Sequence, residues 1–330
     1  MLTLIARRLV WCVVVMFFIS LFAFILYFVL PPVSPALLFA GKAATPAQVV
    51  QAKISLGLNH SVPVQYFLFV KHLVLGDQYG WPGLGFSFIT RKSVLSLIGP
   101  RLVVTITLGV GALLMWLVLG ITIGTFAAVR RNSAVDRVSL GVSMFLLSAP
   151  PFWLALVFLW LFWFKLGIAP GSGYYPIGQY GFGTWLSHMI LPWLVLALLY
   201  AAWYARMTRG AVLDVLSRDF VLTARGKGLS ERRVLMIHVL RAALTPMLTM
   251  VGMDIAGLIS GVVVVEYVFN LNGVGQFALN SVLNDDIPSV LAVTLLGALA
   301  VTVCNLVIDV LYYYVDPRLR TSIGERVDLA

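Results

Sequence analysis

Six long apolar stretches, separated by polar or basic segments, organise the chain. Each has at least about 20 residues, and a helix of that length crosses the roughly 30 Å hydrocarbon core of a bilayer. Backbone N–H and C=O groups in lipid must pair within the protein, which favours helices over isolated strands. The pattern predicts an all-α integral membrane protein with six transmembrane helices, at Leu9–Leu30, Leu102–Val129, Val138–Phe164, Leu186–Ala205, Ala242–Val265 and Ile287–Val315.

Prolines inside these stretches modify the helices without changing their number. Pro150 and Pro151, Pro192, and Pro246 predict kinks or new helix starts. The first stretch follows two arginines, as the apolar part of a signal peptide would. It is longer than that part usually is, so we expect an uncleaved first span.

Residues 31–101 have mixed polarity and are too numerous for a simple connection. We expect a small external cap of short helices here, one of them at Ala47–Leu56. Asp77, Tyr79 and Trp81 either contact an external partner or pack the cap together, and packing is favoured. The predicted domains are an N-terminus with the first helix (1–30), the external cap (31–101) and a core of five transmembrane helices with a basic loop at 206–241 (102–330).

Composition and charge agree with a membrane location. Hydrophobic residues make up 61% of the chain and charged residues only 11%, whereas soluble domains carry about a quarter charged residues. The net charge of +10 arises from Lys and Arg in short loops between apolar stretches, which argues against nucleic-acid binding. Most of the 23 Lys and Arg residues share one side if both termini are cytoplasmic, with Arg318, Arg320 and Arg326 among them. We therefore predict a multi-pass protein of a bacterial-type plasma (inner) membrane in that orientation.

The two cysteines suggest no special chemistry. Cys12 and Cys304 lie inside apolar stretches, without CxxC spacing and without a nearby histidine cluster. We expect both to be small buried hydrophobic residues. The sequence predicts no metal site and no catalytic residue.

The largest charged segment is residues 206–241, with eight Lys and Arg residues between two apolar stretches. Charge alone supports two interpretations equally: a docking site for a soluble partner, or a basic loop that only fixes topology.

Helix signals within this segment predict a short helix. Ser217 can cap its start, Asp219 lies in its first turn, and Arg225 and Lys227 lie at its end, which suits the helix dipole. Gly226 and Gly228 then supply a left-handed stop. A second helix, which begins at Ser230 and Glu231, runs into the fifth span. A short amphipathic helix between glycine joints could convert a push by a cytoplasmic partner into a rotation of that span.

Residues 223–249, TARGKGLSERRVLMIHVLRAALTPMLT, resemble the cytoplasmic coupling segment of ABC importer permeases of the dipeptide/oligopeptide class. The general family pattern is Glu-Ala-Ala, three residues and Gly. Here Leu222, Thr223, Ala224 and Gly228 occupy that register, without the leading Glu, and Gly226 stands where the class more often has Ala. Further resemblance covers most of the chain in family order, at residues 56–77, 120–137, 148–162, 167–176, 188–198, 262–277 and 305–320.

The resemblance implies a heterodimer with a second, homologous permease, two cytoplasmic ATP-binding subunits and an extracytoplasmic substrate-binding protein, all within membrane lipid. The chain has no GxxxxGK[ST], and its Gly41-Lys42 and Gly226-Lys227 pairs are not followed by Ser or Thr. We therefore expect a transport subunit that is not an enzyme. It would bind no cofactor, with ATP and magnesium held in partner subunits.

The resemblance assigns ATPase coupling to eleven consecutive residues. Phe220, Val221 and Leu222 would supply apolar contact in a groove of an ATP-binding subunit. Acidic residues at the rim of that groove would meet the basic side chains of Arg218, Arg225 and Lys227. The alternative is a helix that lies flat on anionic lipid. The eleven residues are Arg218, Asp219, Phe220, Val221, Leu222, Thr223, Ala224, Arg225, Gly226, Lys227 and Gly228.

Two acids lie within the last two spans. Asp254 is in the middle of the fifth, where a carboxylate costs several kcal/mol unless it is paired or faces water. It either lines the translocation path and meets a peptide amino terminus, or is a protonated or hydrogen-bonded acid between helices. Asp309, near the cytoplasmic end of the sixth span, is expected to pair with a loop arginine.

By analogy with the family, Glu266 and the stretch Tyr267–Gly275 form a re-entrant segment that helps to build an external gate. Gly273 and Gly275 are expected to allow its tight turn.

The predicted function is thus a permease subunit of an ATP-driven dipeptide or oligopeptide importer. Within the same family the cargo could instead be nickel, glutathione or another small solute. A secondary transporter is a remote alternative, since it predicts inverted repeats that the sequence lacks. An intramembrane hydrolase that uses His188 with Ser148, or Asp254 with Asp309, has no supporting motif.

Overall fold

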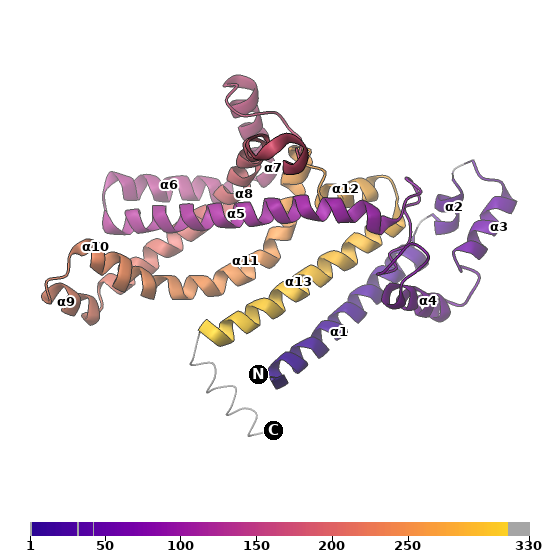
Figure 1. The fold of residues 1–330 in the computed structure, drawn as a ribbon, viewed down its shortest axis with the longest axis horizontal. Coiled ribbons are helices and arrows are strands. Elements are labelled where there is room, and N and C mark those ends of the chain that lie inside the picture. Colours follow the sequence, from indigo (N-terminus) through magenta and orange to yellow (C-terminus); the bar gives the residue numbers. More distant parts are fainter. Residues whose placement is uncertain (1, 32, 42, 316–330) are drawn as a thin grey trace. The chain divides into compact units, whose positions relative to one another are not determined.

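The computed structural model describes residues 2–31, 33–41 and 43–315. Within these residues the helices are joined by turns and irregular segments, which contain two isolated β-bridges, Asp77 with Gly80 and Phe86 with Ser93. The chain divides into two compact units, Met1–Val103 with Gln276–Ala330, and Val104–Gly275. Figure 1 labels the helices, and α5 (Val94–Val129) and α12 (Val274–Leu283) each contribute to both units.

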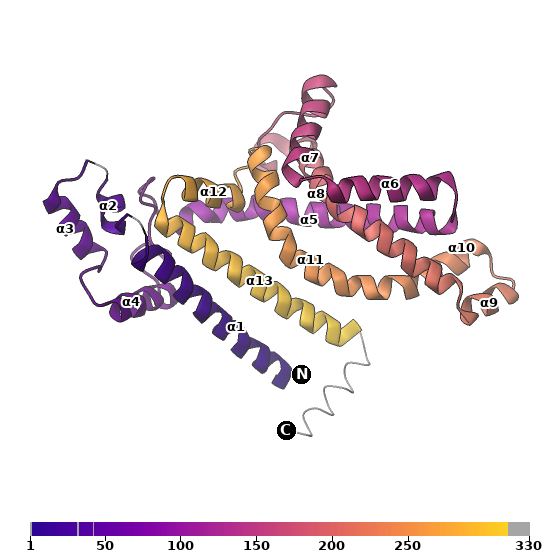
Figure 2. The same ribbon diagram turned by 180° about the vertical axis from the view of Figure 1, so that it is seen from behind.

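The first unit is built on the two long helices α1 (Leu2–Phe24) and α13 (Ile287–Val315), which lie side by side in both ribbon views (Figures 1 and 2). Ala23 of α1 packs in one apolar cluster with Leu291 and Leu295 of α13. A π-helical turn, η1 (Ile25–Val29), extends α1. The smaller helices of this unit are α2 (Pro35–Ala40), α3 (Pro46–Ser55) and α4 (Val62–Leu75).

Short helices in residues 31–101 confirm the expectation of local helical structure there. The helix α3 begins with a capping box, in which the backbone N–H of Thr45 donates to Gln48 Oε1 at 2.8 Å. Asp77 serves packing, since its carboxylate accepts the backbone N–H groups of Tyr79 (2.7 Å) and Gly85 (2.8 Å). Trp81 donates its indole N–H to the Val74 carbonyl at 2.9 Å, but the residue is 71% exposed, so both of its expected roles stay open.

The second unit contains most of α5, α6 (Ala134–Ser148), α7 (Pro151–Phe158) with its π-helical continuation η2 (Leu159–Lys165), and α8 (Ile177–Leu216). It continues with α9 (Asp219–Gly226), α10 (Glu231–Arg233), η3 (Val234–Val239) and α11 (Leu240–Val268). Its core is buried and aromatic-rich, around Trp116, Tyr204 and Phe269.

Glycines on α5 allow this helix to approach α8 closely. A Cβ atom on Gly111 would lie 2.1 Å from the Trp193 ring, and one on Gly120 would lie 2.5 Å from Tyr204 Cβ. The Trp193 indole N–H donates to the Thr107 carbonyl on α5 at 3.0 Å. The pairing of α5 and α8 therefore depends on small residues, as is usual for helices in membranes.

Four of the described helices are long and apolar enough to cross a membrane: Ala6–Val29, Val94–Val129, Ile177–Leu216 and Ile287–Val307. The stretch predicted as one span at Val138–Phe164 is a bent pair, α6 with α7 and η2, at 110°, which makes a fifth candidate if the pair is one broken span. Pro150 and Pro151 account for the bend, because proline cannot continue a helix that precedes it. The predicted fifth stretch falls on α11, where many side chains lie outside the described residues. The helices of the described residues agree with the predicted class of all-α membrane protein.

The segment 206–241 is more helical than a loop. The helix α8 continues eleven residues beyond Ala205, as far as Leu216. Val212 and Val215 are apolar residues at helical spacing in this extension, and they form its buried face. Near its start α8 is interrupted at Gly181, whose φ is +81°.

Candidate functional site

The short helix predicted in the basic segment is present as α9. Asp219 lies in its first turn and Arg225 in its last, as the dipole argument required. The predicted cap is wrong: Arg218 is the N-cap residue, without a capping side chain. Ser217 instead ends α8 and donates to the Asp214 carbonyl at 2.8 Å.

One face of α9 packs into the protein and the other remains exposed. Val221 and Ala224 are buried in an apolar cluster with Val212 and Val215 of α8 and Val234 of η3. Between and beside them, the side chains of Phe220 (45% exposed) and Leu222 (57% exposed) are open. Of the three apolar residues expected to contact a partner, Phe220 and Leu222 are therefore accessible, whereas Val221 belongs to the protein's own core.

A left-handed joint follows α9. Gly228 has φ +78°, while Gly226 is the last residue of the helix and shows no left-handed φ. The Gly228 N–H donates to the Arg225 carbonyl at 2.9 Å, and Leu229 N–H donates to the Ala224 carbonyl at 3.4 Å. The predicted stop is thus confirmed at Gly228 and absent at Gly226.

An ion pair spans this joint. Arg225 donates Nε and Nη2 to the two carboxylate oxygens of Glu231 at 2.8 and 3.1 Å. Both side chains are well exposed, so the pair contributes under about 1 kcal/mol. From Glu231 the backbone passes through α10, η3 and α11 without a break, so the joint leads directly into the long helix that carries Asp254.

Asp254 is a half-buried acid on α11 that faces α8. The Tyr204 hydroxyl donates to Asp254 Oδ2 at 2.6 Å. Tyr204 is fully buried, and Trp116 lies beside it and stacks on Tyr200 with ring centroids 4.5 Å apart. The carboxylate therefore has one tyrosine donor within an aromatic wall.

Glu266, at the end of α11, is fully buried. The Thr105 hydroxyl donates to its Oε1 at 2.5 Å and accepts the backbone N–H of Val274 at 2.9 Å. The Leu271 N–H donates to the Glu266 carbonyl at 3.0 Å. Glu266 and Thr105 thus hold the chain between α11 and α12 against α5.

The two glycines of this loop have another role than the one predicted. Neither Gly273 nor Gly275 has a positive φ; the left-handed residues of the turn are Asn270 (φ +50°) and Asn272 (φ +59°). A Cβ on Gly273 would lie 2.2 Å from the Glu266 carboxyl carbon, and one on Gly275 would lie 2.7 Å from the Val263 Cα. The glycines are needed for close approach to α11. The two asparagines were the sequence signal for the turn, since Asn tolerates the left-handed region.

A buried ion pair that sequence reasoning missed joins α6 to α8. Arg209 donates Nε to Asp136 Oδ1 at 2.5 Å and Nη2 to Oδ2 at 2.8 Å. Asp136 is 2% exposed and also accepts the Asn132 backbone N–H at 2.9 Å. No local sequence pattern predicts this ion pair, because its two residues are 73 positions apart.

The remaining candidate residues lie in separate parts of the chain. His188 contacts the Thr184 carbonyl at 2.8 Å and lies against the Tyr175 ring. The side chain of Asp309, and residues Arg318, Arg320 and Arg326, lie outside the described residues. Among the residues described, no three His, Cys, Asp or Glu side chains form a group that could hold a metal ion. Cys12 and Cys304 are free and only partly buried, against expectation.

Comparison with known families explains this arrangement. Residues 120–321 match the family of binding-protein-dependent transport system inner membrane components, and residues 1–109 match the N-terminal part of such components. The chain belongs to this family. It is a permease subunit of an ABC importer of the peptide class.

Relatives match the permease over nearly its full length. A probable peptide ABC transporter permease of Sinorhizobium fredii is 36% identical over 96% of this chain and 98% of its own. A dipeptide transport permease, DppB of Alkalihalophilus pseudofirmus, is 33% identical over 95% and 98%. The glutathione transport permease GsiC of Escherichia coli is 36% identical over 97% and 99%.

Membership of the family also settles the kind of activity. Permease subunits are non-enzymatic membrane components, and partner subunits carry the ATPase. We therefore expect the functional residues of this permease to be those that contact partners and cargo.

Proposed function

We propose that this permease forms half of the translocation path of an ATP-driven importer of dipeptides or oligopeptides. It would pair with a second homologous permease, dock two ATP-binding subunits that hold ATP and magnesium, and receive cargo from an extracytoplasmic binding protein. Six spans with both termini cytoplasmic complete the proposal. The observation that carries it is the split face of α9, with Val221 and Ala224 packed inward and Phe220 and Leu222 exposed.

This split face suits a helix that transmits force between proteins. An exposed apolar pair on a helix with exposed Arg218 at its start and Lys227 at its end offers a soluble partner both burial and charge. The buried face ties α9 to α8 and η3, so displacement of α9 would move the base of α11. The joint at Gly228 and the weak Arg225–Glu231 pair let α9 change its angle at small cost.

The path is proposed to pass Asp254. A peptide amino terminus is a cation, and a half-buried carboxylate with one tyrosine donor retains acceptor capacity for it. The loop held by Glu266, Gly273 and Gly275 is proposed as part of an external gate, since its packing against α5 would let helix motion displace it.

Peptide cargo is favoured by the relatives. The matched proteins are named as peptide, dipeptide and glutathione permeases, and glutathione is itself a small peptide. Nickel is less well supported, because no group that could hold a metal ion occurs among the residues the structure describes.

Reconstitution tests the proposal. The permease, its homologous partner, the ATP-binding subunits and the external binding protein are placed in vesicles with a radiolabelled dipeptide. ATP-dependent accumulation that requires every component is expected. Uphill uptake by this permease with ATP alone, or peptide uptake without the ATP-binding subunits, would contradict it.

Asp254→Asn tests the path. Loss of a charged hydrogen bond to the peptide amino terminus should lower uptake about tenfold, with the affinity of the binding protein for peptide unchanged. Tyr204→Phe keeps the carboxylate and should have the smaller effect. Unaltered uptake of both cationic and neutral peptides by Asp254→Asn would remove this residue from the path.

A further inference from the structure

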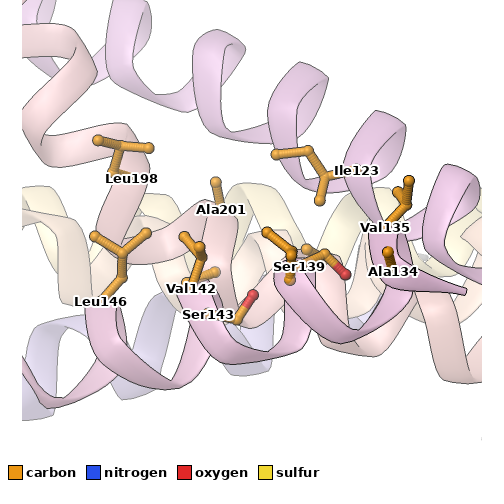
Figure 3. Close-up of a pocket in the computed structure, with 12 residues that line it drawn as sticks. Ile123, Ala134, Val135, Ser139, Val142, Ser143, Leu146, Leu198 and Ala201 are labelled. Carbon is orange, nitrogen blue, oxygen red and sulfur yellow. The ribbon is translucent and has the colours of Figure 1, made fainter.

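A cavity of about 480 Å³ lies within the second unit, between α5, α6 and α8. Figure 3 shows Val142 and Leu146 of α6 on one side of it, with Leu198 of α8 and Ile123 of α5 on the other. Its volume falls within the range of pockets that hold small organic ligands.

The lining of this cavity suits a hydrocarbon chain. Apart from Ser139 and Ser143, its walls are Ala, Val, Leu and Ile side chains. The Ser139 hydroxyl is already satisfied, since it donates to the Asp136 carbonyl at 2.9 Å. A polar ligand would find few partners here, whereas apolar contact would be favourable.

Positive charge lies at one end of the cavity. Ala134 and Val135, which line that end, are the first residues of α6. Arg130 and Arg131 in the turn before them and Arg137 in the same helix are all exposed. The buried acid at the start of α6, Asp136, is already engaged by Arg209 and by the backbone N–H of Asn132. Arg137 donates one N–H to the Asn132 carbonyl at 3.4 Å, and no salt bridge engages any of the three arginines among the residues that the structure describes, so their charge is available to an outside anion.

We propose that this cavity binds an anionic phospholipid of the leaflet that we predict to be cytoplasmic. An acyl chain would occupy the space between α6 and α8, and the phosphate would meet the arginines of the turn. The amphiphile fits both halves of the site, since basic pockets between membrane helices bind anionic headgroups. A helix of the second permease would fill the apolar part but would leave the arginine rim without a partner.

Native mass spectrometry of the detergent-purified transporter complex tests this proposal. The complex is titrated with phosphatidylglycerol and, separately, with phosphatidylcholine of the same chains. We expect phosphatidylglycerol to bind with clear preference. Arg130→Gln/Arg131→Gln should reduce that preference by roughly tenfold or more, because each basic residue near the headgroup contributes to the attraction. The control Arg232→Gln/Arg233→Gln removes the same charge from exposed positions on α10 and should leave it unchanged.

A second pair of variants tests the cavity itself. Val142 lines it and is 51% exposed, so Val142→Trp should fill it without disturbing the core and should reduce binding of both lipids. Met144 is 61% exposed on the same helix but does not line the cavity, so Met144→Trp should bind normally. Equal binding of the two lipids by the unmodified complex would overturn the proposal. So would loss of the second permease on Val142→Trp, since that would assign the cavity to the heterodimer.

Discussion

Replacing both Phe220 and Leu222 with Asp is expected to release the ATP-binding subunits from the transporter. These two side chains are the exposed apolar pair of α9, and each change puts a charge where the proposed interface is apolar. Loss of one central contact residue typically costs about 2 kcal/mol or more, so the pair should weaken association by two to three orders of magnitude. Copurification of the ATP-binding subunits with the permease measures this association, and uptake of peptide should fall in parallel.

The folded permease should survive this change, because Val221 and Ala224 keep the inner face of α9 packed. Ser217→Asp/Ser230→Asp is the matched control: it adds two negative charges at exposed positions beside α9 and leaves the apolar pair intact. That control should retain the subunits. Normal copurification by the Phe220/Leu222 variant, or equal loss in the control, would show that apolar docking on α9 is not the basis of assembly.

Gly273→Ala is expected to disable transport with little effect on docking of the ATP-binding subunits. The added Cβ would stand 2.2 Å from the carboxyl carbon of Glu266, which is fully buried and held by Thr105, so neither group can move aside cheaply. Overpacking of this kind costs about 1–3 kcal/mol and would displace the loop from α5 and α11. We expect severalfold to tenfold lower uptake, with the ATP-binding subunits still bound.

The matched control for this prediction is Gly141→Ala on α6, where an added Cβ meets no atom within 4 Å. It should leave uptake unchanged. Full uptake by Gly273→Ala would mean that the loop tolerates displacement, and its role in an external gate would be lost.

Local signals allowed much of this architecture to be predicted. Apolar length indicated the long helices, Pro150 and Pro151 indicated the bend after α6, and the charges at Asp219 and Arg225 indicated α9. Gly228 marked the joint because a left-handed φ favours glycine. Each of these features depends on residues close together in sequence.

What escaped prediction depends on contacts between distant segments. The bonds of Tyr204 to Asp254 and of Arg209 to Asp136 are set by how α8 packs on its neighbours, and no periodicity encodes that register. Gly273 was visible in the sequence, but the carboxylate it approaches was not. The burial of the Val221 side chain similarly depends on its contacts with the neighbouring helices α8 and η3.

Site-directed cross-linking tests the central claim most directly, that the exposed face of α9 contacts an ATP-binding subunit. In a permease with Cys12 and Cys304 replaced by Ser, Leu222→Cys is treated with a thiol-specific photocross-linker in the assembled transporter. Its neighbour Val221→Cys, whose position is fully buried, serves as the control. The account predicts a cross-link to the ATP-binding subunit from position 222 and none from 221. Equal yields at the two positions, or labelling of position 222 by an impermeant reagent from the external medium, would contradict it.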